Sequence, residues 1–517
     1  MERYRINYFF LIVSVIAVVC AVYWQSLFLS FIQDDWGLLR FLQENSSFTA
    51  LDFFKYESTL FYRPLAQAYM FLMYKLFGPN PIPFHVAALF IHAINACLVA
   101  LILNIIIRDR LISYLAALVY VAAIAIHLDP LAWMVGIYDV LGAFFFFMCM
   151  WLFLRNQPAI SMIFYFLGCL VKESVVLIPV LLFSYPFIRH PTAKLKDQVL
   201  AYWKKTIPFL LAMGVVLTIR LSGNSPFELP AAHPYLFDLK GFHFIRNILI
   251  YPAWMLQSFF PFVSVKQPAF QFLTFLVGLV LSYGIFVTFR MRGEESNHRR
   301  VLFFFVWIIV GLLPALFLAN HTYRYYCTYS LPAFIASFLL LFKCIFLSID
   351  VRGKVISAIL ISISSLAVIG SISQGTKIYS EGLRQNTLSD GTNELIRRAA
   401  FVDIVRKGLT QDLPHPPSDS FIVIGNADLW SFNKNSGPQF WYNNGTISVY
   451  ALSDLKYKDG QPYIHNPIES QLQSFTGSTN KKIFLDPSSL FVYQVSNGKL
   501  VRIDAQDLEE SQRQSKP

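Results

Sequence analysis

The chain has 517 residues, of which 56% are hydrophobic and only 14% are charged, and its mean hydropathy is +0.50. This composition excludes a soluble globule for the first three quarters of the chain and predicts a polytopic membrane protein. The net charge of +11 does not indicate nucleic-acid binding, because the Lys and Arg residues are concentrated in short loops between apolar segments, where membrane topology demands them.

Eleven apolar segments approach the roughly 17 to 25 residues that a helix needs to cross a bilayer. The first is too long for a signal peptide and is expected to remain as an anchor. The segments are Asn7–Leu29, Pro83–Ile107, Leu111–Ile126, Tyr138–Leu154, Ala159–Val171, Ser174–Ile188, Thr206–Ile219, Phe270–Phe289, Val301–Ala319, Tyr329–Phe346 and Val355–Ser373. A further stretch, Phe244–Phe262, is expected to be re-entrant or interfacial, because a crossing there would reverse the side of the later basic loops.

The basic loops alternate with acidic ones along this order of segments. Arg3 and Arg5 fall on the same side as the basic loops, which predicts a cytoplasmic N-terminus. The loop at 30–82, the tip at Lys172 and Glu173, and the C-terminal part then face the opposite side. The short arm before Lys172 predicts that this tip lies recessed below the outer interface. We expect a bacterial inner-membrane protein whose C-terminal domain is periplasmic or extracellular.

The composition divides the chain into three parts. Residues 1–373 are predicted to form the membrane domain, whose first outer loop at 30–82 carries amphipathic interfacial helices. Residues 374–503 have the turn residues and short β-like runs of a small α/β or β-rich soluble domain. Residues 504–517 are polar enough to be disordered. The fold expected is therefore a polytopic α-helical membrane protein with a small extracytoplasmic domain.

Asp34 and Asp35 follow the first apolar segment directly and are the most informative pair in the sequence. Acids near hydrocarbon are costly, which makes them candidates for function. One of them could merely cap the following helix, but a cap needs a single Asp. Two carboxylates can divide the labour: one accepts a proton from an attacking hydroxyl, while the other positions an acceptor or a cation. We expect Asp34 and Asp35 to be catalytic.

Three cationic side chains on the same predicted side are candidates to bind a phosphate: Arg63, Lys172 and Arg324. The planar guanidinium of arginine matches a phosphate group in a bidentate manner. The alternative is internal pairing, such as that of Lys172 with Glu173 or Asp139.

Other polar residues near these positions are expected to line a polar cavity. His85 and His92 lie seven residues apart on one face of the second segment, and hydrogen bonds to neighbouring helices are favoured over a role in a site as their explanation. The residues expected to line the cavity are Tyr62, His85, His92, Asp129, Asp139 and Glu173.

The order of these motifs resembles the GT-C superfamily of integral-membrane glycosyltransferases. The likeness is greatest to its protein O-mannosyltransferase-like branch and to the transmembrane O-mannosyltransferases that carry tetratricopeptide repeats. The resemblance covers the membrane part, and this chain departs from it in having no repeat array after that part, no basic residue directly before Asp139, and no Pro directly after His127. The motifs are Asp34-Asp35, Tyr62-Arg63-Pro64-Leu65, His85 with His92 and Asn95, Asp129 to Trp133 with Gly136 to Asp139-Val-Leu, Lys172-Glu173, and Tyr323-Arg324-Tyr325-Tyr326.

The resemblance implies transfer of a sugar from a polyprenyl-phosphate donor to a hydroxyl of a glycan, lipid or protein acceptor on the non-cytoplasmic face. Asp34 or Asp35 would act as the general base, and Arg63, Lys172 and Arg324 would stabilise the departing phosphate. A divalent cation, Mg or Mn, at the two acids stays open. A transporter or flippase of a lipid-linked substrate, and a membrane scaffold, are the alternatives. A transporter is expected to have repeated halves, and none is visible.

Overall fold

The structure is a computed structural model that describes residues 7–55, 61–189, 195–221, 229–263, 268–290, 295–384, 394–458, 461–465 and 482–503. Arg3, Arg5 and the predicted tail at 504–517 lie outside these ranges. The helices of the first part of the chain are α1 (Tyr8–Tyr23), α2 (Asp34–Glu44), α3 (Pro64–Phe77), α4 (Pro81–Ile107), α5 (Arg110–Ala122), α6 (Ile124–Ala132), α7 (Ile137–Leu154), α8 (Pro158–Cys169), α9 (Ile178–Ser184), α10 (Pro186–Arg189), α11 (Leu195–Leu221), α12 (His243–Leu256), α13 (Pro268–Arg290), α14 (Glu295–Leu316), α15 (Leu331–Ser348) and α16 (Gly353–Arg384).

Within the described ranges, seven helices are long and apolar enough to cross a membrane: Tyr8–Phe28, Pro81–Ile107, Met134–Leu154, Tyr202–Ile219, Asn297–Leu316, Leu331–Ser348 and Gly353–Gly382. The chain is therefore an integral membrane protein. The predicted segment Leu111–Ile126 is a pair of helices, α5 and α6, bent by 50° at Ala123. Three further predicted segments fall on shorter apolar helices, Pro158–Cys169, Glu173–Ser184 and Thr274–Val287. Eleven crossings stay a prediction.

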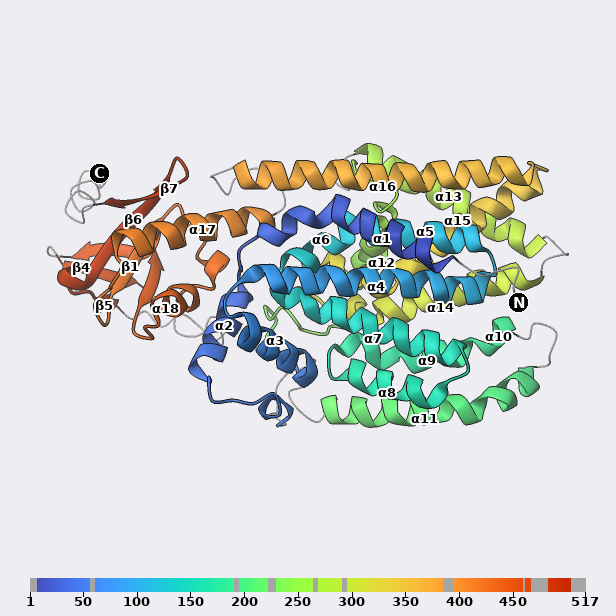
Figure 1. Cartoon of the computed structure of the whole chain (residues 1–517), viewed down its shortest axis with the longest axis horizontal. Helices are drawn as coiled ribbons and strands as arrows, with labels where there is room; N and C mark the ends of the chain where they lie inside the picture. The colour runs from blue at the N-terminus through green and yellow to red at the C-terminus, as the bar shows by residue number, and fades with distance from the viewer. Residues whose placement is uncertain are drawn as a thin grey trace.

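The helices form one elongated bundle with the C-terminal part at one end (Figure 1). The start of α1 and helix α10 lie at the opposite end. Lys343 Nζ of α15 lies 2.7 Å from Asp109 Oδ2 at the start of α5, and Lys205 Nζ of α11 lies 2.6 Å from Asn156 Oδ1 in the turn before α8. Helix α12, which covers most of the stretch expected not to cross, has 14 residues and contains Pro252.

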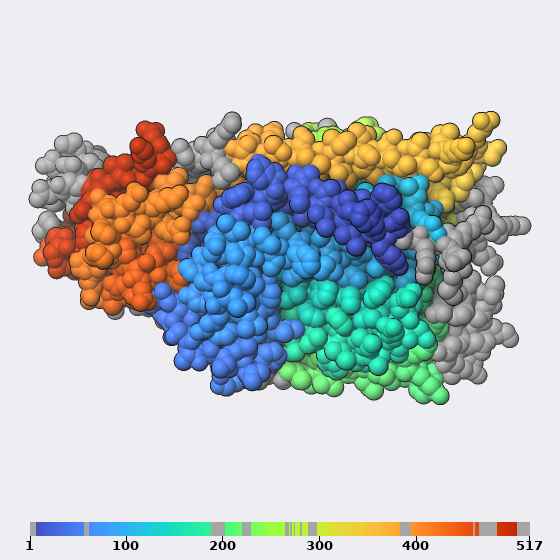
Figure 2. Space-filling view, in the orientation of Figure 1, coloured from blue at the N-terminus to red at the C-terminus, as the bar shows by residue number. Residues whose placement is uncertain are grey.

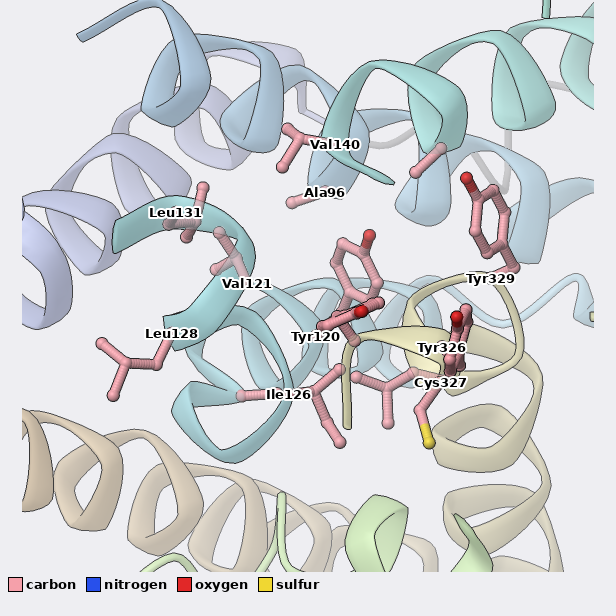
Figure 3. Packing of buried hydrophobic residues seen from close by; sticks show 14 of the residues in the cluster. Ala96, Tyr120, Val121, Ile126, Leu128, Leu131, Val140, Tyr326, Cys327 and Tyr329 are labelled. Atoms are coloured by element: carbon pink, nitrogen blue, oxygen red, sulfur yellow. The ribbon is translucent and has the colours of Figure 1, made fainter. Parts of the chain in front are cut away.

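The core of the bundle is made by side chains from helices that are far apart in sequence. Leu128 and Leu131 of α6, Val140 of α7 and Tyr329 all belong to one buried apolar cluster (Figure 3). Tyr329 belongs to η6, a 3-10 helix at Arg324–Tyr329, and its carbonyl oxygen accepts a 2.9 Å hydrogen bond from the buried Trp307 indole. The segment after α14 is thereby held inside the bundle.

The first outer loop contains the two predicted amphipathic helices. Helix α2 buries Trp36, Leu39 and Leu42. Helix α3 begins at Pro64, which occupies its first turn, and ends before Gly78, which has a φ of 61°. Both helices lie at the end of the bundle that carries the C-terminal part (Figure 1).

The C-terminal part is a mixed α/β domain. Its elements are α17 (Glu394–Asp412), α18 (Ser436–Tyr442), β1 (Phe421–Gly425), β2 (Ser448–Ala451), β3 (Leu455–Lys458), β4 (Gln461–His465), β5 (Lys482–Phe484), β6 (Leu490–Ser496) and β7 (Lys499–Ile503). One sheet has the order β2-β1-β6-β7, in which β1 is parallel to both neighbours and β7 is antiparallel to β6; the other, β3-β4-β5, is antiparallel. Helix α16 runs past the predicted domain boundary at Ser373.

The domain rests directly on the membrane part. Figure 2 shows its surface continuous with that of the first outer loop. The Trp36 ring of α2 lies 5.7 Å from the Phe440 ring and 5.3 Å from the Trp441 ring of α18. Residues of α17, β1 and α18 belong to the same buried apolar cluster as the membrane helices. The two parts therefore share one core at their junction.

Candidate functional site

Asp35 is bound by backbone amides from two separate segments. Its Oδ2 accepts hydrogen bonds from the amides of Ile32, at 3.0 Å, and Met134, at 3.4 Å, and its Oδ1 accepts one from Val135 at 2.9 Å. The side chain is buried, with 1% of its surface exposed. Burial raises the pKa of this carboxyl to about 8. The hydrogen bonds from the three amides lower the pKa, and the charge of Asp34 raises it. Asp35 fixes the start of α2.

The amides that bind Asp35 come from the turn between α6 and α7. This turn is the 3-10 helix η4 at Met134–Gly136. A Cβ atom on Gly136 would lie 2.5 Å from Pro130 Cα and 2.6 Å from Pro130 O, so only glycine permits the turn to close this tightly. Two motifs of the sequence, the acidic pair and the stretch from Asp129 to Asp139, are therefore parts of one structural unit.

Asp34 has the opposite environment. Its carboxylate makes no hydrogen bond and no ion pair with any part of the chain that the structure describes. It is partly buried in the first turn of α2, outside the membrane-spanning segments, and burial raises its pKa. A carboxyl group with a raised pKa and both oxygens available can accept a proton from a substrate hydroxyl. The two adjacent acids are thus chemically distinct.

Arg63 is paired with Glu173. Its Nε lies 3.0 Å from Glu173 Oε2 and its Nη2 lies 2.6 Å from Oε1, which is a bidentate pair. The guanidinium also lies over the rings of Phe61, at 4.5 Å, and Tyr138, at 5.2 Å. The arginine side chain is 11% exposed and the glutamate side chain 30%, so Glu173 is the more accessible partner.

Lys172 is paired with Asp139, which was one of the pairings considered from the sequence. The Lys172 Nζ to Asp139 Oδ2 distance is 3.1 Å, and both side chains are only 6% exposed. Gly142, one turn after Asp139, makes room for this pair, because a Cβ there would lie 2.9 Å from Lys172 Cβ. The predicted position of Lys172 below the outer membrane interface stays a prediction, since the burial of its side chain describes packing within the protein. The ammonium also lies 5.9 Å from the Tyr326 ring centre.

Arg324 has different neighbours from the other two cations. Its Nη1 donates to Gln257 Oε1 at 2.7 Å and to the Ala125 carbonyl at 3.4 Å, and its guanidinium lies 5.3 Å from the Trp254 ring centre. The charge of Asp129 acts on it. Burial lowers its pKa. Arg324 and Asp129 therefore belong to a second group, and the three predicted phosphate-binding cations do not share one set of contacts.

The remaining predicted residues have structural partners. The ring nitrogens of His85 lie 3.2 Å from the carbonyl oxygens of Leu131 and Leu29, and His92 Nε2 lies 3.1 Å from the carbonyl oxygen of Val121. These contacts tie α4 to its neighbours, as the structural interpretation of the two histidines expects. The Tyr62 hydroxyl donates to the Phe54 carbonyl oxygen at 3.0 Å within the first loop.

Tyr235 and His321 belong to the site but were not predicted from the sequence. The charges of Arg63, Glu173, Asp34 and Asp139 all act on the Tyr235 phenol. His321 stacks on Tyr235 with a ring separation of 4.4 Å, and the charges of Lys172, Arg63 and Glu173 act on it. The segment that carries Tyr235 has no motif, so its aromatic residues gave no signal. His321 lies two residues before the stretch that begins at Tyr323 and could have been included.

The C-terminal domain borders the site on the side of Asp34. The Gln33 amide, directly before Asp34, donates a 2.8 Å hydrogen bond to the Ser431 carbonyl. The exposed Tyr323 is affected by the charges of Asp34 and Asp129 from the membrane part and of Glu394 and Arg398 from α17. The domain therefore sits close enough to the acids to influence what reaches them.

The described residues contain no group of three or more His, Cys, Asp or Glu side chains placed to hold a metal ion. Because Asp35 is occupied by three amides, Asp34 is the only one of the two acids with free oxygen atoms. No model of a known protein family matches this chain, and no curated protein matches it. The function therefore has to be inferred from the residues described above.

Proposed function

We propose that this protein is a membrane glycosyltransferase that moves a sugar from a polyprenyl-phosphate donor to an acceptor hydroxyl. The observation that carries the proposal is that the Asp34 carboxylate has no partner among the described residues and lies near a cation. The charges of Asp34 and Arg63 both act on the Tyr235 phenol. A base and a cationic group around one position fit a reaction in which a hydroxyl loses a proton while an anionic group departs.

In the proposed reaction, the Asp34 carboxylate takes the proton of the acceptor hydroxyl, and the acceptor oxygen bonds to the anomeric carbon. The bond between that carbon and the phosphate oxygen breaks, and its electron pair goes to the phosphate. Arg63 and Lys172 stabilise the negative charge that develops there. A single displacement of this kind inverts the anomeric centre.

Both cations are paired with acids in this structure, so a donor phosphate has to compete with a carboxylate. Glu173 is the more accessible of the two acids and is bound by the Arg63 fork that also suits a phosphate. We therefore assign Arg63 to the donor phosphate and Glu173 to the position that the phosphate takes over. Lys172 stays paired with the buried Asp139, and its positive charge stabilises the phosphate without direct contact.

Replacing Asp34 by Asn tests the proposal. The variant removes the base but keeps the size of the side chain, so we expect transfer of labelled sugar from a polyprenyl-phosphate donor to a crude envelope acceptor to fall by about 10²-fold or more. Thermal unfolding should be unchanged, because the Asp34 carboxylate has no partner in the described chain to lose.

Asp52→Asn is the matched control, because Asp52 lies in the same loop but pairs with Lys55 and Thr49 on its surface. Transfer by this control should equal that of the wild type. Full transfer by the Asp34→Asn variant would remove the proposed base. Movement of the intact donor across vesicles without any transfer would favour the transporter instead.

A further inference from the structure

Tyr235 is held at the site by a segment that is fixed on both sides. The side-chain amide of Asn320 donates to the carbonyls of Ala231, at 2.8 Å, and His233, at 3.1 Å. Two backbone hydrogen bonds of 3.0 Å join residues 236–238 to residues 317–319. The segment before α12 is thus attached to the turn after α14. Tyr235 is therefore placed by the fold and does not depend on a loose loop.

The Tyr235 ring contacts aromatic residues on the Arg63 side of the site and on the Lys172 side. On one side it contacts Phe61 at 4.5 Å, and Arg63 lies over that same Phe61 ring. On the other side it stacks on His321, whose Nδ1 is 2.8 Å from the Tyr326 hydroxyl. Tyr326 in turn lies under Lys172. A continuous series of contacts joins the two cations through Tyr235.

The Tyr235 hydroxyl has no hydrogen-bond partner among the residues that the structure describes. The side chain is only partly buried, so this hydroxyl is not enclosed by apolar groups. Burial raises its pKa to about 12, although the Arg63 charge opposes that shift. The phenol is therefore protonated at neutral pH and able to donate a hydrogen bond.

We propose that Tyr235 binds the donor directly, by donating a hydrogen bond from its hydroxyl to an oxygen of the phosphate that Arg63 receives. This inference rests on the proposed function and adds to it a residue from a segment with no motif. The phenol touches the leaving group but transfers no proton. Its hydrogen bond strengthens as the bond to the anomeric carbon breaks and negative charge grows on the phosphate oxygen.

Replacing Tyr235 by Phe tests this inference, because the variant keeps the ring contacts with Phe61 and His321 and loses only the hydroxyl. A hydrogen bond to a charged group predicts that the dissociation constant for polyprenyl phosphate rises roughly tenfold or more. We expect kcat/KM for the donor to fall by a similar factor. The thermal unfolding temperature should stay at the wild-type value. If the hydroxyl had a purely structural role, a loss of binding would come with a lower unfolding temperature.

Tyr283→Phe is the matched control, since Tyr283 is an exposed tyrosine on α13 that contacts Phe286. It should bind polyprenyl phosphate and transfer sugar as the wild type does. If the wild type transfers sugar and the Tyr235→Phe variant binds and reacts equally well, the role of Tyr235 is refuted while the proposed function stands. If the wild type itself neither binds polyprenyl phosphate nor transfers sugar, both proposals fail together.

Discussion

Asp34 and Asp35 are neighbours in the first turn of α2 but have opposite environments, because only Asp35 faces the turn at Met134–Gly136. The side chain of Asp35 points to the backbone amides of that turn, whereas the oxygens of Asp34 have no partner in the described chain. A carboxylate held by several amides is fixed in position, and a free one can exchange a proton. The pair therefore combines a positioning residue with a candidate base.

The titration of Asp35 makes a prediction about stability. Its folded-state pKa of about 8 lies above the 3.8 of a free carboxyl, so the folded protein holds this proton more tightly than the unfolded chain does. The resulting stabilisation is present at pH 4 and is lost as the pH rises toward 8. We expect the thermal unfolding temperature in detergent to fall over this range for the wild type, and to depend less on pH for Asp35→Asn.

The Asp35→Asn variant should also be less stable throughout that range. Both carboxylate oxygens accept from backbone amides, so the NH2 group of Asn would face at least one of these donors. A buried donor left without a partner costs about 1 to 3 kcal/mol. Asp419→Asn is the control, because Asp419 is exposed and has a φ of 60° that suits Asn. Its unfolding temperature should change with pH as that of the wild type does. Parallel curves for the Asp35→Asn variant and the wild type would contradict this account.

At this scale, the sequence identified the ionisable residues and one possible pair among them, but not their other partners. Lys172 and Asp139 were recognised as a possible pair, because a buried cation near the membrane needs an acid. The separate roles of Asp34 and Asp35 could not be predicted, since the amides that distinguish them come from a turn about a hundred residues later. Tyr235 could not be predicted either, because its proposed role depends on contacts with two other segments, at Phe61 and at His321.

The turn between α6 and α7 is the element on which Asp35 depends, and Gly136 makes its closure possible. Gly136→Ala would place a methyl group 2.5 Å from Pro130 Cα, a backbone atom that cannot move without shifting the turn. Overpacking of this kind costs about 1 to 3 kcal/mol. We expect a lower unfolding temperature and a fall in sugar transfer, because the displaced Met134 and Val135 amides would no longer hold α2.

Gly214→Ala provides the control for this change. A Cβ on Gly214 meets nothing within 4 Å, and alanine favours a helix such as α11 more than glycine does. This variant should be as stable as the wild type or slightly more so. An unchanged unfolding temperature for Gly136→Ala would show that the turn can open at no cost, and would remove the proposed link between the turn and Asp35.

The elements with local signals were predicted well, and those defined by tertiary contacts were not. Pro64 and Gly78 mark the ends of α3 in the sequence as they do in the structure. The break at Ala123 has no such signal, so α5 and α6 were taken as one segment. Strands β3 and β4 have only a weak local signal because Lys, Gln and Pro interrupt their apolar pattern, and they pair with each other, β4 also with β5.

At the scale of the whole molecule, the sequence predicted a separate outer domain, whereas the structure joins that domain to α2. The Trp36 ring packs between residues of α18 that lie some four hundred positions further along the chain. Such a contact has no local signature, because Trp36 equally suits the buried face of an amphipathic helix. The consequence is functional, since α2 carries Asp34 in its first turn. The domain should therefore affect the candidate base through the position of this helix.

Replacing Trp441 by Ala tests that coupling. The change removes one of the two rings of α18 that pack on Trp36, and an edge-to-face aromatic pair contributes about 0.5 to 1.5 kcal/mol beyond its buried area. We expect backbone amides of α2 to exchange hydrogen for deuterium several times faster in the variant, and sugar transfer to fall although Asp34 is intact. Phe484→Ala, at an exposed position in the second sheet of the same domain, should change neither quantity. Faster exchange in α2 with undiminished transfer would show that the domain stabilises the helix without positioning the base, whereas unchanged exchange would mean that α2 is held by the membrane helices alone.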